Sequence, residues 1–125
     1  MLGNKNVNAT IAVKDLAAAR KFYEGTLGLK LIEAQDGEAA SYKSGDSTVL
    51  VYQSQYAGTN KATAATWVVG EDLEGVVQAL KAKGVVFERY DLPGTTRKGD
   101  VHFGGNLKLA WFKDPAGNIL ALVSE

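Results

Sequence analysis

The sequence contains no cysteine and only one histidine, His102. The absence of cysteine excludes disulfide bonds, thiolate nucleophiles and cysteine-ligated metals, although it leaves the redox compartment of the protein open. A single imidazole also excludes any metal site built from several histidines. Most of the common metal and thiol chemistries are therefore absent from this chain.

The chain also lacks a net charge, because its 14 basic residues are balanced by 14 acidic ones. A neutral chain has no surplus of cations with which to neutralise phosphates, so we expect no nucleic-acid partner. No stretch approaches the roughly 18 consecutive apolar residues of a membrane span, and the polar start does not resemble a signal peptide. We therefore expect a cytoplasmic protein without a membrane partner.

What the chain does contain is the balance of a globular protein. Its 125 residues are 46% hydrophobic and 22% charged. This length is enough for one compact core and too short for two ordinary domains. The sequence therefore predicts a single domain over residues 1–125.

The first half of the sequence alternates between strand and helix signals. Residues 7–13, VNATIAV, place apolar side chains at every second position, which is typical of a strand. Asp15 then stands where a helix N-cap is expected, and Gly28 can end that helix in a left-handed conformation. Strands are predicted at 29–34, 38–44 and 47–54. The acidic residues Glu33, Asp36 and Glu38 between them are explained by a solvated turn.

The second half repeats this plan. A strand around Thr66 is followed by a helix predicted to be capped at Asp72 and to end at Gly84. Thr66 and Gly84 correspond to Thr10 and Gly28, and the hairpin at 112–121 aligns with the hairpin at 42–51. The sequence therefore predicts an α+β fold of two βαβββ modules, about 7–56 and about 62–125, which bury their sheets by pairing.

Two segments carry a resemblance to a known family. Residues 11–31, IAVKDLAAARKFYEGTLGLKL, resemble the opening of vicinal oxygen chelate proteins, and residues 111–122, WFKDPAGNILAL, are similar to their closing hairpin. This superfamily includes glyoxalase I, bleomycin-resistance proteins and extradiol dioxygenases. The resemblance implies that the two modules curl a mixed sheet around a groove, usually within a homodimer.

In metal-dependent members of this superfamily, four ligands come from the first and last strands of both modules. The resemblance places these positions at Asn8, Val51, Ala64 and Ala121. Valine and alanine offer no donor atom, and one amide oxygen does not hold a catalytic divalent ion. We therefore expect no metal and no cofactor in this protein.

Strand alternation then predicts which side chains line the groove. The polar groups on that face are predicted to be Asn8, Thr10, Gln53 and Thr66, in a mostly apolar surface suited to a small organic ligand. Packing of two sheets without a ligand is the alternative explanation. The groove-facing residues are predicted to be Asn8, Thr10, Ala12, Val49, Val51, Gln53, Ala64, Thr66, Val68, Ile119, Ala121 and Val123, and those facing the helices Ile11, Val13, Leu50, Trp67, Val69, Leu120 and Leu122.

Three further residues are candidates for contact with a ligand. Tyr90 and Trp111 can stack on a planar molecule, although aromatic residues in strands more often belong to the core. His102 can act as a general base, but no orienting carboxylate is evident, so the sequence favours a surface loop residue. It lies in the long segment 91–106, which contains four glycines and is predicted to be a loop able to act as a lid.

These observations leave three hypotheses for function. The first is a protein that binds a small apolar or aromatic molecule in a metal-free groove. The second is an enzyme of the superfamily, of lyase, isomerase or dioxygenase type, which uses either an unrecognised metal site or no metal. The third is a role in assembly only, with dimerisation as its purpose. Because no catalytic constellation is evident, the sequence favours binding over catalysis.

Overall fold

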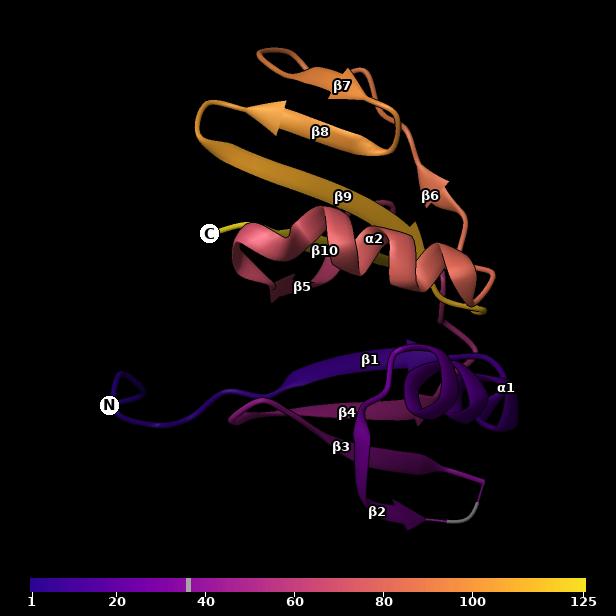
Figure 1. Cartoon of the computed structure of the whole chain (residues 1–125). Helices are drawn as coiled ribbons and strands as arrows, with labels where there is room; N and C mark the ends of the chain where they lie inside the picture. Colours follow the sequence, from indigo (N-terminus) through magenta and orange to yellow (C-terminus); the bar gives the residue numbers. More distant parts are fainter. Residues whose placement is uncertain (36) are drawn as a thin grey trace.

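The computed structural model of this chain describes residues 1–35 and 37–125, so Asp36 of the predicted acidic turn lies outside the described residues. Each half of the sequence forms its own mixed sheet (Figure 1). The first sheet has the strand order β1 (Ala9–Val13), β4 (Ser47–Gln53), β3 (Ala39–Ser44) and β2 (Lys30–Gln35). The second has the order β5 (Thr63–Val68), β10 (Ile119–Val123), β9 (Leu107–Lys113), β8 (Val101–Gly104) and β7 (Thr96–Lys98), with β6 (Phe87–Glu88) also paired to β9. The predicted α+β fold of two repeated modules is confirmed. Both sheets are open, however, and no single sheet curls around a groove within the described chain.

The first module begins with a capped helix beside two parallel strands. Its elements are β1 (Ala9–Val13), α1 (Leu16–Arg20), a π-helical extension η1 (Lys21–Thr26), β2 (Lys30–Gln35), β3 (Ala39–Ser44) and β4 (Ser47–Gln53). The Asp15 carboxylate accepts hydrogen bonds from the N–H groups of Ala17 and Ala18, as a helix N-cap does. Gly28 adopts a φ of 75° just beyond the helix, so both predicted helix ends are confirmed.

The second module repeats this order and adds strands. Its elements are β5 (Thr63–Val68), the short 3₁₀ helix η2 (Gly70–Asp72), α2 (Leu73–Ala82), β6 (Phe87–Glu88), β7 (Thr96–Lys98), β8 (Val101–Gly104), β9 (Leu107–Lys113) and β10 (Ile119–Val123). Asp72 makes no side-chain capping bond, because η2 precedes α2 and continues into it. The prediction of a loop over 91–106 is wrong, because this segment contains the β7–β8 hairpin.

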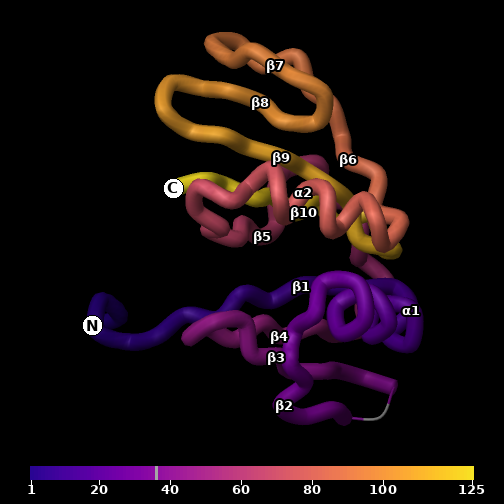
Figure 2. The backbone as a smooth tube through the Cα atoms, viewed as in Figure 1, coloured from indigo at the N-terminus to yellow at the C-terminus, as the bar shows by residue number. Residues whose placement is uncertain are grey.

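The two modules share one hydrophobic core on the helix-covered sides of their sheets. Ile11, Tyr23 and Val51 of the first module belong to the same cluster of buried residues as Leu73 and Phe112 of the second. The rings of Phe22 and Phe112 lie 6.2 Å apart across the boundary. In Figure 2 the backbone passes between the modules through the segment that joins β4 to β5. The chain therefore folds as one unit, although its sheets are separate.

A buried carboxylate joins the modules at the turn between β9 and β10. Asp114 is 5% exposed, and its oxygens accept hydrogen bonds from the Tyr23 hydroxyl at 2.8 Å, the Asn118 side chain at 2.8 Å and the N–H groups of Ala116 and Asn118. The Asn118 side chain also donates to the carbonyl of Ala12 in β1. The turn 114–117 therefore connects the modules, in addition to reversing the chain.

None of the described helices is long and apolar enough to cross a membrane.

Candidate functional site

The candidate site lies on the open face of the second sheet, opposite α2. Leu120 and Leu122 of β10 point into the core, so Ile119, Ala121 and Val123 point to the other side. Ala121 is in register with Thr66 of β5 and with Trp111 of β9, which places these side chains on the same face. The prediction that Thr66 and Ala121 share the face opposite the helix is therefore correct.

The predicted face is wrong for β4 in the first module. Val51 is in register with Ile11, and both are buried under α1 at 0% and 2% exposure. Gln53 points the same way, and its side-chain oxygen accepts a hydrogen bond from the N–H of Leu16 at the start of α1. Leu50 occupies the open face instead. An alignment error of one residue exchanges the two faces of a strand, and β4 was predicted with that error.

The structure corrects one of the four positions that correspond to metal ligands in relatives. The register pairs Thr10 with Leu50, as it pairs Thr66 with Ala121, so the set becomes Asn8, Leu50, Ala64 and Ala121. These side chains do not fit a divalent metal, because three of them carry no donor atom. Among residues 1–35 and 37–125, no three histidine, aspartate or glutamate side chains converge on a point that could hold a metal ion.

The aromatic rings of Tyr90, His102 and Trp111 meet on the open face of the second sheet, near the C-terminal end of β9. The ring centroids of Trp111 and His102 lie 4.8 Å apart, and those of Trp111 and Tyr90 lie 5.4 Å apart. Both pairs are edge-on, at 86° and 71°. Sequence reasoning named all three residues, and only the strand pairings of β6, β8 and β9 bring them together.

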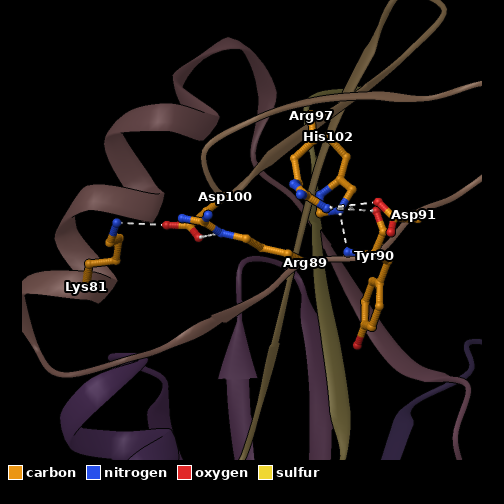
Figure 3. Close-up of polar contacts among 7 residues, drawn as sticks. All are labelled: Lys81, Arg89, Tyr90, Asp91, Arg97, Asp100 and His102. Atoms are coloured by element: carbon orange, nitrogen blue, oxygen red, sulfur yellow. Dashed lines mark hydrogen bonds and ion pairs between the residues drawn. The ribbon is translucent and has the colours of Figure 1, made fainter.

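His102 is a buried residue of β8, and the prediction that it is a surface loop residue is wrong. Its side chain is 0% exposed, and its Nε2 atom accepts a hydrogen bond of 3.0 Å from the N–H of Tyr90 (Figure 3). A neutral imidazole with an accepting Nε2 carries its proton on Nδ1. Neither ring nitrogen then has a free lone pair. This geometry makes His102 an anchor for the backbone at Tyr90 and a poor general base.

The Tyr90 side chain carries a hydroxyl with no hydrogen-bond partner among the described residues. Its ring is half-buried, and its hydroxyl is shielded from solvent. Burial, and then the neighbouring Glu88 carboxylate, raise the pKa of the Tyr90 hydroxyl above its ordinary value. The phenol therefore stays protonated at neutral pH and is available to donate a hydrogen bond.

A β-bulge adds Thr63, which sequence reasoning did not select. Thr63 pairs with Ile119 and Ala65 pairs with Leu120, so Ala64 is an extra residue in β5. The bulge allows the hydroxyl of Thr63 to accept a hydrogen bond of 3.2 Å from the Trp111 indole N–H. Strict alternation predicts Thr63 on the opposite face from Ala64 and Thr66. The register shift follows from strand pairing, so no local pattern could have indicated it.

A cavity of about 370 Å³, open to the surface, lies beside these side chains, and we call it the Trp111 cavity. Its lining residues are Lys61, Ala62, Thr63, Tyr90, Leu92, Trp111 and Ile119. Its size lies at the lower end of the range for small-molecule sites, and its walls are mainly apolar. All of its lining residues follow β4 in the sequence, so the first module does not contribute to it.

Most of the predicted site residues on β1 and β5 lie outside the Trp111 cavity. Asn8 precedes β1, and Thr10 lies within it, and both are exposed. Thr66 and Ala64 are exposed on β5, whereas Ala121 is 3% exposed between the strands that flank it. Of the residues predicted to contact a ligand or face the groove, Tyr90, Trp111 and Ile119 line the Trp111 cavity.

Comparison with known proteins identifies the family of this chain. The sequence profile of the Glyoxalase/Bleomycin resistance protein/Dioxygenase superfamily matches residues 7–122. The chain belongs to this superfamily. The resemblance found in the two terminal segments is thus confirmed over almost the whole length. No curated protein matches the sequence significantly.

Solved structures with the same fold are similar over their entire length. A lactoylglutathione lyase from Agrobacterium tumefaciens has a TM-score of 0.73 and 16% identity, with 97% of this chain and 94% of that chain covered. The fosfomycin resistance protein FosX from Mesorhizobium loti has a TM-score of 0.70 and 13% identity, with 98% and 92% covered. An integron cassette protein from the mobile metagenome of a Halifax Harbour sewage outfall reaches 0.72 at 17% identity, with 97% and 99% covered. At these identities the similarity establishes the fold alone.

A charged cluster lies beside the aromatic residues and gives a prediction for pH dependence. Arg89, adjacent to Tyr90, extends away from the aromatic rings to Asp100, which also binds Lys81 at 2.7 Å (Figure 3). The Asp100 side chain is only 9% exposed. Hydrogen bonds from Lys81, and then from Arg89, hold the pKa of Asp100 below its ordinary value.

The lowered pKa of Asp100 determines how its contribution to stability changes with pH. Asp100 contributes stability above the pKa that it has in the unfolded chain, and this contribution is lost as pH falls through its lower folded value. Asp100→Asn should therefore destabilise the protein at neutral pH, and the two unfolding free energies should converge below about pH 4. Urea titrations at a series of pH values measure this difference. A difference independent of pH would contradict the assigned role.

Proposed function

We propose that this protein binds a small aromatic molecule in the Trp111 cavity and does so without a metal. The observation that carries this proposal is the Tyr90–Trp111 pair, which forms two walls of a cavity of about 370 Å³. Exposed apolar cavities with few polar groups are typical of ligand sites. In an edge-to-face pair each ring keeps at least one face that the other ring does not cover, and such a face can stack on a planar ligand.

The chemistry of the surrounding residues supports binding over catalysis. The positions that hold a metal in relatives carry Asn8, Leu50, Ala64 and Ala121, and these do not fit a metal ion. His102, which could have served as a base, uses its Nε2 lone pair to hold the backbone N–H of Tyr90. The proposal is therefore a cytoplasmic binding protein, in which the aromatic residues supply the affinity.

The proposal includes a homodimer. Apolar side chains remain exposed on the open sides of the two sheets, including Val68 at 65%, Leu107 at 39% and Tyr52 at 38%. Exposed apolar surface of this kind favours association with another protein surface. A second copy of the chain would cover it, and sedimentation at several protein concentrations tests this part of the proposal.

The two tryptophans of the chain provide a test of the binding site. Trp111 lines the cavity, whereas Trp67 lies on the other face of the second sheet and donates a hydrogen bond to the Ser44 hydroxyl. Trp67→Phe leaves Trp111 as the only indole, and Trp111→Phe leaves Trp67. We expect p-nitroanisole, a neutral aromatic quencher, to quench the Trp67→Phe protein saturably and the Trp111→Phe protein only weakly and without saturation.

The opposite pattern, or quenching without saturation in both variants, would refute binding in the Trp111 cavity. Metal analysis of the purified protein provides a second check. Stoichiometric nickel, zinc, manganese or iron retained through dialysis would contradict the metal-free part of the proposal and support a superfamily enzyme.

A further inference from the structure

We infer that the ligand of the Trp111 cavity is a planar aromatic carboxylate, recognised by Lys61, Thr63 and Tyr90. The inference rests on the proposed function and assigns a ligand class to the same site. It depends on three observations. The side chains of Lys61, Thr63 and Tyr90 can each donate a hydrogen bond, the one formal charge among the lining residues is positive, and the aromatic walls favour a flat molecule.

The polar groups of the cavity are arranged to donate. The Thr63 hydroxyl already accepts the indole N–H of Trp111 at 3.2 Å, so its own proton remains available for another acceptor. The Tyr90 hydroxyl has no partner among the described residues, although it is shielded from solvent. A buried hydroxyl without a partner is unfavourable, so a ligand oxygen that comes within reach of it is favoured.

The charge of the lining residues also favours a ligand that carries acceptor oxygens. Lys61 lines the cavity, is exposed, and forms no ion pair within residues 1–35 and 37–125. The acidic side chains nearest in sequence to Tyr90 are already engaged, because Glu88 pairs with Lys113 at 3.4 Å and Asp91 with Arg97 at 3.3 Å. No carboxylate lines the cavity. An anionic ligand would therefore meet one free cation and no like charge.

The shape of the cavity favours a flat ring. Trp111 and Tyr90 meet at 71°, so a planar molecule that stacks on one ring presents its edge to the other. Leu92 and Ile119 supply apolar contacts beside these rings. A planar ring with one carboxylate combines this apolar surface with acceptors for the donors at the cavity edge. His102 contributes as a positioning residue, because it holds the backbone of Tyr90.

The experiment compares 2-naphthoate with 2-naphthamide, which has nearly the same shape and no charge. We expect calorimetry to show that the wild-type protein binds the carboxylate about tenfold more tightly than the amide, the difference expected for one charge-assisted contact. Lys61→Met should reduce this ratio to near one, because it weakens binding of the carboxylate more than binding of the amide. Added salt should weaken binding of the carboxylate more than binding of the amide.

The matched control is Lys21→Met, which removes an exposed lysine from η1 in the first module. It should leave the affinity ratio unchanged. Equal affinities for the two naphthalenes in the wild-type protein would overturn the carboxylate inference and leave aromatic binding intact. The inference would also be overturned if neither compound bound while p-nitroanisole quenched Trp111 saturably. Failure of all three compounds would refute the proposed function itself.

Discussion

Replacing Asp114 by alanine should lower the free energy of unfolding by about 3–5 kcal/mol, because it removes the acceptor of a buried polar network. The side chain accepts four hydrogen bonds, two from side chains and two from backbone N–H groups. Alanine leaves all of these donors without a partner in a site that is 5% exposed in the native protein. Each buried donor that loses its acceptor costs roughly 1–3 kcal/mol.

Part of the stability lost in Asp114→Ala should come from the hydrogen bond between Tyr23 of the first module and Asp114 of the second. Burial, and then the neighbouring Asp114 carboxylate, raise the pKa of Tyr23 well above its ordinary value, so its phenol remains a donor over the accessible pH range. Tyr23→Phe should therefore cost less than Asp114→Ala. It should also cost little when Asp114 is already alanine, because the partner of the hydroxyl is then absent. Urea unfolding of the two single variants and the double variant measures this coupling.

Asp46→Ala is the matched control for this prediction. Asp46 lies in the corresponding hairpin turn of the first module and is exposed. Its replacement should change the unfolding free energy by no more than about 0.5 kcal/mol. Similar losses for Asp46→Ala and Asp114→Ala would mean that the carboxylate serves only as a turn residue, and the role assigned to it between the modules would be wrong.

Gly58→Ala should lower the free energy of unfolding by about 2–5 kcal/mol, the sum of backbone strain and a steric clash. Gly58 lies in the segment between the modules and has a φ of 73°, a conformation that side chains disfavour. A Cβ atom on this residue would collide with the carbonyl oxygen of Ala116, within the turn that Asp114 organises. Because this neighbour is backbone, it cannot move aside by a change of rotamer.

Gly105→Ala is the control that separates the cost of backbone strain from the cost of the steric clash in Gly58→Ala. Gly105 has a φ of 59° in the turn between β8 and β9, and nothing lies within 4 Å of the position that its Cβ would occupy. It should therefore cost only the strain, about 1–2 kcal/mol. Thermal and urea unfolding of both variants provide the comparison. If Gly58→Ala were no more destabilising than Gly105→Ala, close contact between the linker and the 114–117 turn would be refuted.

Most of the fold was predictable from local patterns. The alternation in residues 7–13, the cap at Asp15 and the left-handed glycines Gly28 and Gly84 each depend on interactions within a few residues. The internal repeat then indicated two similar modules. The β7–β8 hairpin was missed, because its glycines are equally compatible with an open loop and its strands of 3 and 4 residues carry little periodicity.

The candidate site was less predictable, because it depends on register. Val51 and Gln53 were predicted on the wrong face by an alignment error of one residue, and Thr63 was missed because a bulge interrupts alternation in β5. Tyr90, His102 and Trp111 were each identified as candidates. Their separation in sequence gave no indication that the rings meet, or that His102 binds the backbone of Tyr90.

The sequence alone determined the two-module architecture and the lack of donor side chains at three of the four positions that hold a metal in relatives, because both follow from residue identity and short-range periodicity. Correcting Val51 to Leu50 replaced one aliphatic side chain with another, so that chemical conclusion did not depend on the register. The tertiary structure decided which residues face a ligand and which partners satisfy Asp114 and His102. These depend on contacts between residues far apart in the sequence, whose geometry is set by strand pairing and core packing rather than by local preference.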